Sequence, residues 1–206
     1  MGCALHTDYS LESVEMRNMK VQDDKILAGC CGIYCGLCPR FQSTAKSRCP
    51  GCKILSLTIS CKLYNCCVKQ KGLVTCAECE QWPCEKYGRF FEYDSFVSHQ
   101  VCQPNIKQIR KSGLRKWLAA QKKRRAILEE MLADWNEGRS RNRYCLAAAL
   151  MPPALVQQAV RQAKQVMAKS NVDSSDVKTR ARIMKSAIEE AASKSHIMLQ
   201  LRKKSK

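Results

Sequence analysis

Apolar residues recur at helical spacing through the second half of the chain. Between Asn105 and Trp135, large apolar side chains stand three or four residues apart, which is the spacing of one face of an α-helix. Pro104 precedes this stretch, and Gly113 is a point at which the helix could break or kink. The spacing predicts helix from 105 to 135, with an apolar face made of Leu114, Trp117, Leu118, Leu128, Met131, Leu132 and Trp135.

Two further helices are predicted beyond a polar loop over residues 136–143. The first is a short buried helix from Tyr144 to Leu150. Pro152 and Pro153 then begin the second, because proline suits a first helical position, where no amide hydrogen is needed. The expected buried face of this second helix is Leu155, Ala159, Ala163 and Val166.

The last helix is predicted from its capping residues. Asp173 to Asp176 supply polar side chains that can cap a helix running to about Ala192. Beyond it, alternation of apolar and polar residues over 197–201 predicts a brief closing strand. The expected inner face of the last helix is Val177, Ala181, Met184 and Ile188.

The first half has no comparable period. Residues 1–26 are predicted to be a tail, in which Leu11, Val14 and Met16 could form a short docking turn. Residues 27–98 are dense in Gly, Cys and Pro with short apolar pieces, a pattern typical of loops and brief strands pinned by metal. The predicted fold is therefore a small metal-stabilised cysteine-rich α+β module, followed over 99–206 by a mainly α-helical domain.

Cysteine is concentrated in one segment. Of 15 cysteines, only Cys3, Cys102 and Cys145 lie outside residues 30–84. Met1 to Met16 contains acidic residues and lacks the basic leader of a signal peptide. No stretch approaches the roughly 18 consecutive apolar residues that a membrane helix needs. We therefore expect a cytoplasmic protein without membrane association, in which reduced thiols bind metal instead of forming disulfides.

Three CxxC pairs indicate the metal chemistry: Cys35/Cys38, Cys49/Cys52 and Cys76/Cys79. Two such pairs can place four sulfurs about 2.3 Å from one ion and close a tetrahedral site, which suits zinc. Joining the first two pairs gives a first predicted site. A second site would join the third pair to two of three downstream cysteines, which are Cys61, Cys66 and Cys84.

Other interpretations of the cysteines stay open. A cysteine can be simply a small buried apolar residue, the interpretation given to Cys3, Cys30, Cys67, Cys102 and Cys145. An iron-sulfur cluster is the main alternative to zinc. The CxxxCxxC spacing of Cys31, Cys35 and Cys38 also matches radical enzymes that use S-adenosylmethionine, but the βα alternation of their barrel is missing.

Four cysteine groups also carry a family resemblance. They are CGIYCGLCP at 31–39, CPGC at 49–52, CKLYNC at 61–66 and CAECEQWPCEKY at 76–87. The segment from about 28 to 98 resembles the prokaryotic domain of unknown function 3795 family, in its longer type with a helical C-terminal extension. The family brings no established reaction. The resemblance implies a metal site at Cys31, Cys35, Cys38, Cys49, Cys52, Cys61, Cys66, Cys76, Cys79 and Cys84.

Charge separates the two halves as well. The formal net charge is +18, and nearly all of the excess lies in residues 99–206. Lys122 to Arg125 form a basic run on the helix face opposite Trp117. Such a run is usually a solvated face, yet it could bind nucleic acid or an acidic protein.

No catalytic residue is predicted, because paired carboxylates, a phosphate-binding glycine loop and a histidine dyad are all missing from the sequence. We expect a metal-binding protein, most simply a non-catalytic binding module. The alternative is a redox protein or enzyme that uses the cysteine cluster. Whether the protein is an enzyme is left undecided by the sequence.

Overall fold

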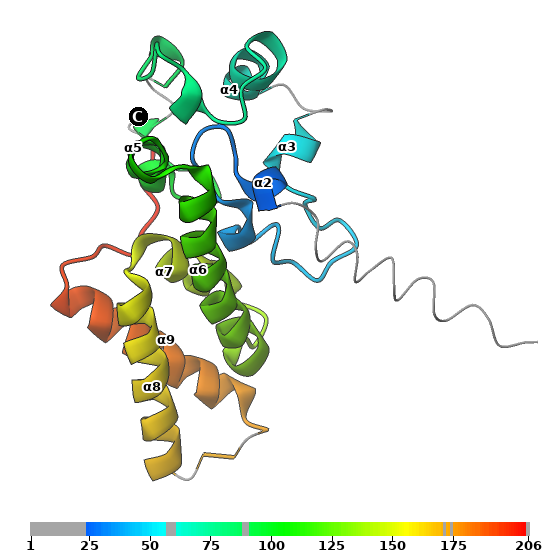
Figure 1. Ribbon diagram of the computed structural model, residues 1–206. Coiled ribbons are helices and arrows are strands. Elements are labelled where there is room, and N and C mark those ends of the chain that lie inside the picture. Colours follow the sequence, from blue (N-terminus) through cyan, green and yellow to red (C-terminus); the bar gives the residue numbers. More distant parts are fainter. Residues whose placement is uncertain (1–23, 57–60, 88–90, 171, 174, 205–206) are drawn as a thin grey trace, which may run out of the picture.

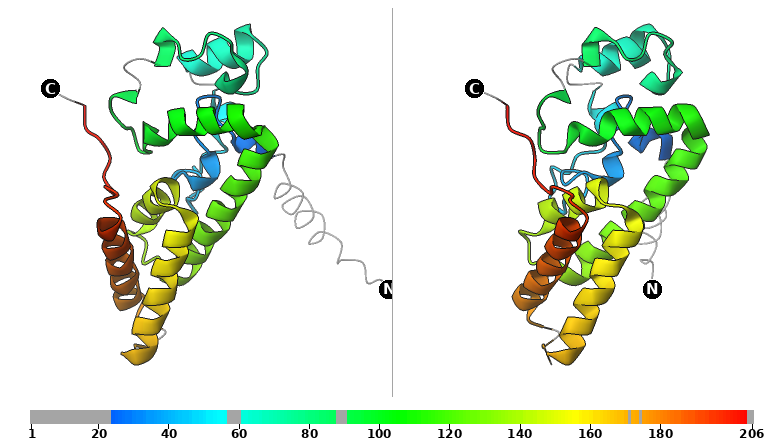
Figure 2. Two further views of the ribbon diagram at one scale, coloured as in Figure 1. Left: turned by 60° about the vertical axis from the view of Figure 1, so that its left-hand side comes forward. Right: turned by 90° about the vertical axis from the view of Figure 1, so that its left-hand side faces the viewer.

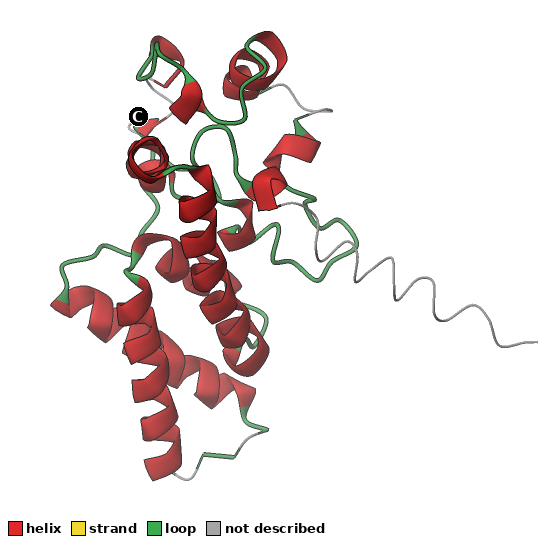
Figure 3. Ribbon diagram, in the orientation of Figure 1, coloured by secondary structure: helices red, strands yellow, loops and turns green. Residues whose placement is uncertain are grey.

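The computed structural model describes residues 24–56, 61–87, 91–170, 172–173 and 175–204 (Figure 1). Within these ranges the protein is mainly α-helical and contains no strand (Figure 3). An isolated antiparallel bridge joins Ala28 to Tyr34. The β part of the predicted α+β module is therefore wrong for the described residues. The physical reason is that the cysteine-rich segment changes direction every few residues in helical turns, which leaves no run long enough to pair as a strand.

Short helical turns build the cysteine-rich segment, and several begin at a cysteine. Cys35 starts η1, Cys52 starts α3 and Cys76 starts η3. Thr75 and Glu78 form a capping box that fixes the start of η3. The turns are α2 (Asp24–Leu27), η1 (Cys35–Leu37), α3 (Cys52–Leu55), α4 (Lys62–Tyr64), η2 (Asn65–Gln70), η3 (Cys76–Glu78), η4 (Glu85–Tyr87) and η6 (His99–Val101).

The predicted long helix is present as two helices. They are α5 (Cys102–Ser112) and α6 (Leu114–Trp135), and the chain turns sharply between them (Figure 2). Gly113 makes the break with φ 81° and ψ 151°, a combination that is essentially restricted to glycine. Trp117 and Trp135 are buried, which confirms the predicted apolar face at these positions.

Three more helices follow: α7 (Arg141–Leu150), α8 (Pro153–Lys169) and α9 (Val177–Lys194). The Asp176 carboxylate accepts a hydrogen bond from the Thr179 amide at 3.0 Å and caps α9, as predicted. Figure 2 shows α8 and α9 together at one end of the molecule, with the cysteine-rich turns and α5 at the other and α6 between them.

The buried faces of α8 and α9 differ in part from the prediction. In α8, Val156 and Val160 are buried, while Leu155 is half-buried and Val166 is exposed. Val177, at the start of α9, is also exposed. The reason is that α8 packs against both α6 and α9. Helical spacing alone does not determine which rows of apolar residues on α8 face these two helices. The predicted positions that are buried are Ala159, Ala163, Ala181, Met184 and Ile188.

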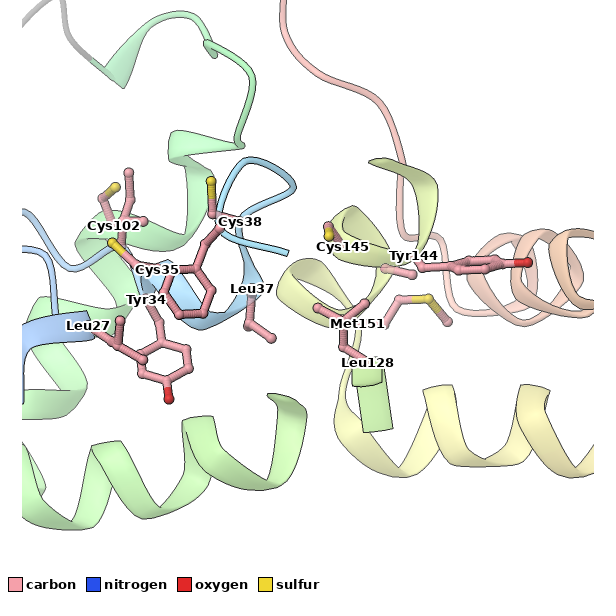
Figure 4. Close-up of a cluster of buried hydrophobic side chains, with 14 of the residues drawn as sticks. Leu27, Tyr34, Cys35, Leu37, Cys38, Cys102, Leu128, Tyr144, Cys145 and Met151 are labelled. Carbon is pink, nitrogen blue, oxygen red and sulfur yellow. The ribbon is translucent and has the colours of Figure 1, made fainter. Parts of the chain in front are cut away.

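One hydrophobic cluster includes residues of both halves (Figure 4). Tyr34 meets Trp117 of α6 edge to face, with ring centroids 6.0 Å apart. Leu37 belongs to the same cluster as Leu128 and Met151. The cysteine-rich segment therefore shares apolar packing with the helical half, because helices α6 and α7 cover η1.

The C-terminal segment returns to the end of the cysteine-rich region (Figure 2). Arg202 donates to the Asp94 carboxylate through its amide at 2.8 Å and through its guanidinium at 2.9 Å. Residues 197–204 are not a strand, so the predicted closing strand is wrong for this part of the chain, which has no neighbouring strand to pair with. Most of the predicted tail, with its possible docking turn, lies outside the described residues.

Candidate metal centre

The two upstream CxxC pairs come together in space. We call Cys35, Cys38, Cys49 and Cys52 the upstream cysteine group. The Cys52 amide donates a hydrogen bond to Sγ of Cys35 at 3.2 Å, although the two residues are 17 positions apart. The Gly51 amide donates to Sγ of Cys49 at 3.4 Å. Amides directed at sulfur are a common surrounding of metal-bound thiolates.

The electrostatics of the upstream cysteine group couple its members. A hydrogen bond from the Cys35 thiol, opposed by burial, lowers the pKa of Cys52 to about 7. Burial raises the pKa of Cys38, which also interacts with the charges of Cys52 and Cys49. The structure thus brings together the four residues of the first predicted site, and their binding of a common ion stays a prediction.

A second concentration of sulfur surrounds a cavity of about 570 Å³. We call it the cysteine cavity. Its other walls combine apolar residues, among them Leu63, Trp82 and Tyr87, with the polar or charged residues Lys71, Gln81, Glu85 and Lys86. Five cysteines line it: Cys66, Cys67, Cys76, Cys79 and Cys84. Of the three downstream candidates, the cavity therefore includes Cys66 and Cys84 and leaves out Cys61.

Lys71 places a positive charge at the cysteine cavity. Its Nζ donates to Sγ of Cys79 at 3.2 Å and to Oε1 of Gln81 at 2.8 Å. The hydrogen bond to Cys79 raises the pKa of Lys71, with further contributions from the charges of Cys66 and Cys84. The ammonium group therefore lies beside sulfur atoms of the cysteine cavity.

Arg110 of α5 holds the third CxxC pair from outside. Its Nε donates to the Ala77 carbonyl at 3.0 Å, and its guanidinium also donates to the Cys79 carbonyl. The same guanidinium lies 5.1 Å from the centroid of the Trp82 ring. The helical half therefore positions the loop that carries Cys76 and Cys79.

Cys30 and Cys67, for which apolar packing was predicted, contact another thiol, that of Cys76. Cys30 and Cys67 both hydrogen-bond to Cys76 and so lower the pKa of the Cys76 thiol, together with a hydrogen bond from Tyr87. The backbone adds a link, since the Cys76 amide donates to the Cys30 carbonyl at 2.9 Å. In the sequence, the only sign of these contacts is that Cys30 and Cys67 each stand next to a predicted ligand, Cys31 and Cys66.

Two predicted ligands lie elsewhere. The Cys31 thiol hydrogen-bonds with Cys102 of α5, and this contact and burial raise its pKa. Within the described ranges, Cys31, Cys35 and Cys38 are not arranged as one three-thiol group. Cys61 precedes α4 and does not line the cysteine cavity. All fourteen described cysteines are free thiols. As they stand, no three His, Cys, Asp or Glu side chains in the described ranges are arranged to hold a metal ion.

The basic run of α6 is not one solvated surface. Arg124 donates to the carbonyl oxygens of Ala148 and Met151 at 2.9 and 2.6 Å, so it caps the end of α7. Arg125 pairs with Glu129 at 2.8 Å. The expectation that residues 122–125 share an open face is wrong for Arg124, whose long side chain reaches around the helix to orphan carbonyls. Lys122 and Lys123 are exposed.

No helix within the described ranges combines the length and apolar character needed to cross a membrane.

In comparisons with known proteins, no family model, no curated protein and no solved structure matches this chain.

Proposed function

We propose that this protein is a thiolate metal-binding module with two centres, one at the upstream cysteine group and one in the cysteine cavity. The observation that carries the proposal is the meeting of residues distant in sequence. Cys35 contacts Cys52, and the cavity gathers cysteines from η2, η3 and the loop at Cys84. Apolar packing alone gives no reason for five thiols to face one cavity.

The upstream cysteine group suits a single zinc ion. Four thiolates from two CxxC pairs form a closed tetrahedral site, without an open position for substrate. The amides of Cys52 and Gly51 would stabilise the negative sulfurs of Cys35 and Cys49. Side-chain rotations would be required, because the Cys35 and Cys52 thiols contact each other and no three of the described side chains are now arranged to hold an ion.

The cysteine cavity favours a second candidate, an iron-sulfur cluster. A volume of about 570 Å³ greatly exceeds the roughly 30 Å³ of one water molecule, whereas a single ion within four thiolates needs no cavity. Apolar walls from Leu63, Trp82 and Tyr87 would shield a cluster from solvent. Lys71 would offset part of the thiolate charge. When bound, such a group supplies electron transfer or structural bracing.

Substitution of single cysteines tests the second centre. Cys79→Ala removes a cavity thiol, and Cys61→Ala removes a predicted ligand outside the cavity. Metal per chain, measured on anaerobically purified proteins, should drop by about the content of one centre in Cys79→Ala and stay unchanged in Cys61→Ala. Equal metal content in wild type and Cys79→Ala would refute a centre in the cavity.

A further inference from the structure

A second, larger cavity of about 1120 Å³ lies where the loop before α3, helices α6 and α7, and the C-terminal segment meet. We call it the basic cavity. No Asp or Glu is found among the described residues that line it. Its positive charges are Lys203 and six arginines: Arg40, Arg48, Arg124, Arg139, Arg141 and Arg143.

Two of these arginines have structural partners. Arg124 donates to backbone carbonyls at the end of α7. Arg143 donates to the Leu199 carbonyl at 2.7 Å and lies 3.5 Å from Glu189. These contacts hold the wall in place, and only one of them involves a carboxylate.

Other guanidinium groups keep donors for a ligand. Arg40 stacks on Phe96 at 4.1 Å from the ring centroid, and Arg48 stacks on Phe41 at 4.5 Å. Stacking fixes the plane of a guanidinium while its N–H groups stay available.

Arg141 is the most informative residue of this cavity. Its Nε is buried, yet none of the described residues accepts a hydrogen bond from it. A buried charged donor without an acceptor costs free energy, and a bound anion would remove that cost. Because Arg141 begins α7, its position is set by the helix.

We propose that the basic cavity binds an organic phosphate of about mononucleotide size. Guanidinium groups pair with phosphate oxygens in a bidentate manner. With no carboxylate among the described lining residues, most of their charge is not offset within the cavity, although Arg143 lies 3.5 Å from Glu189. The volume slightly exceeds the roughly 300–1,000 Å³ of small-molecule sites. Apolar residues such as Ile33, Val97 and Leu146 give the organic part a surface on which to pack. This inference does not rest on the proposed metal centres, although Cys38 and Cys49 of the upstream cysteine group line the same cavity.

Calorimetric titration of the full chain with magnesium-free ADP, pyrophosphate and adenosine, at about 0.15 M salt, tests the proposal. We expect one ADP site per chain, weaker binding of pyrophosphate and no binding of adenosine. Arg141→Gln should weaken ADP binding at least about tenfold, since a charge-assisted hydrogen bond contributes about 1.5–3 kcal/mol. Arg161→Gln makes the same change on an exposed part of α8 outside the cavity, and should leave the affinity within about twofold.

Arg139→Gln provides a second test in case Arg141→Gln does not fold. Arg139 is exposed at the cavity, so its replacement should weaken ADP binding severalfold without loss of helicity. Metal content is measured on the same samples, because Cys38 and Cys49 also line this cavity. The proposal is overturned by absent ADP binding, by equal weakening in Arg161→Gln and the cavity variants, or by tighter binding of a ten-nucleotide RNA than of ADP.

Discussion

At the scale of single residues, cysteines occupy two kinds of environment. Cys145 of α7 is 2% exposed and belongs to the hydrophobic cluster, and burial raises the pKa of its thiol to about 12. Cys79 is partly exposed and receives a hydrogen bond from Lys71. The first packs as a small apolar side chain, and the second lies at the surface of the cysteine cavity beside a cation.

Cys145→Ser should therefore reduce stability without affecting metal. Replacing this buried thiol by a more polar hydroxyl costs about 1–3 kcal/mol, which urea unfolding would detect as a lower midpoint. Metal content should equal that of the wild type. If Cys145→Ser lost metal as Cys79→Ala is expected to, the distinction between the two environments would be wrong.

The Asp94–Arg202 pair gives stability a dependence on acid pH. Burial by itself raises the pKa of Asp94, but hydrogen bonds from the Arg202 side chain and amide and from the His99 amide lower it from 3.8 to about 2. Because the folded-state pKa lies below the unfolded-state value, the stabilisation is complete above about pH 4 and is lost as the pH falls toward about 2.

Asp94→Asn should accordingly lower the free energy of unfolding at neutral pH by about 2 kcal/mol. The difference from wild type should shrink to near zero at about pH 2. Asp134→Asn, at an exposed position of α6, is the control and should have little effect at either pH. A penalty for Asp94→Asn that is the same at both pH values would show that ionisation is not its cause.

At the scale of elements, the helices could be predicted because their signals are local. Apolar spacing located α6 through Trp117 and Trp135, and Asp176 marked the start of α9. The exposed Val166 was placed inside because period alone does not identify the partners of α8. The closing strand was predicted from alternation over 197–201, but a strand needs a partner, and that depends on the tertiary fold.

Gly113 separates α5 from α6, and its backbone conformation gives a direct prediction. Gly113→Ala introduces a side chain at φ 81° and ψ 151°, with no described atom within 4 Å of the new Cβ. The cost is therefore backbone strain and not a clash, and should be about 1–3 kcal/mol in urea unfolding. Ser112→Ala, one residue earlier, should cost much less. An unchanged stability of Gly113→Ala would mean that the break between α5 and α6 is not enforced by backbone conformation.

At the scale of the whole molecule, contacts between distant segments decide what the cysteines do. Pairing of Cys35/Cys38 with Cys49/Cys52 could be predicted, because short spacers make such pairs meet. The roles of Cys30 and Cys67 could not, because their contacts with Cys76 span up to 46 positions and exist only in the folded chain. The same holds for the basic cavity, whose arginines and lysine come from four separate segments.

The shared hydrophobic cluster connects the cysteine-rich segment to α6. Tyr34 of the cysteine-rich segment packs on Trp117 of α6. If the upstream cysteine group binds metal as proposed, removal of that metal should therefore disturb the surroundings of Trp117, while α8 and α9 keep their helicity.

Elemental analysis, together with an absorption spectrum of anaerobically purified wild-type protein, tests most directly whether the cysteines hold metal. We expect two thiolate centres per chain, seen as about two zinc ions, or as zinc together with iron, acid-labile sulfide and absorption near about 400 nm. Fewer than about one metal ion per chain would contradict it.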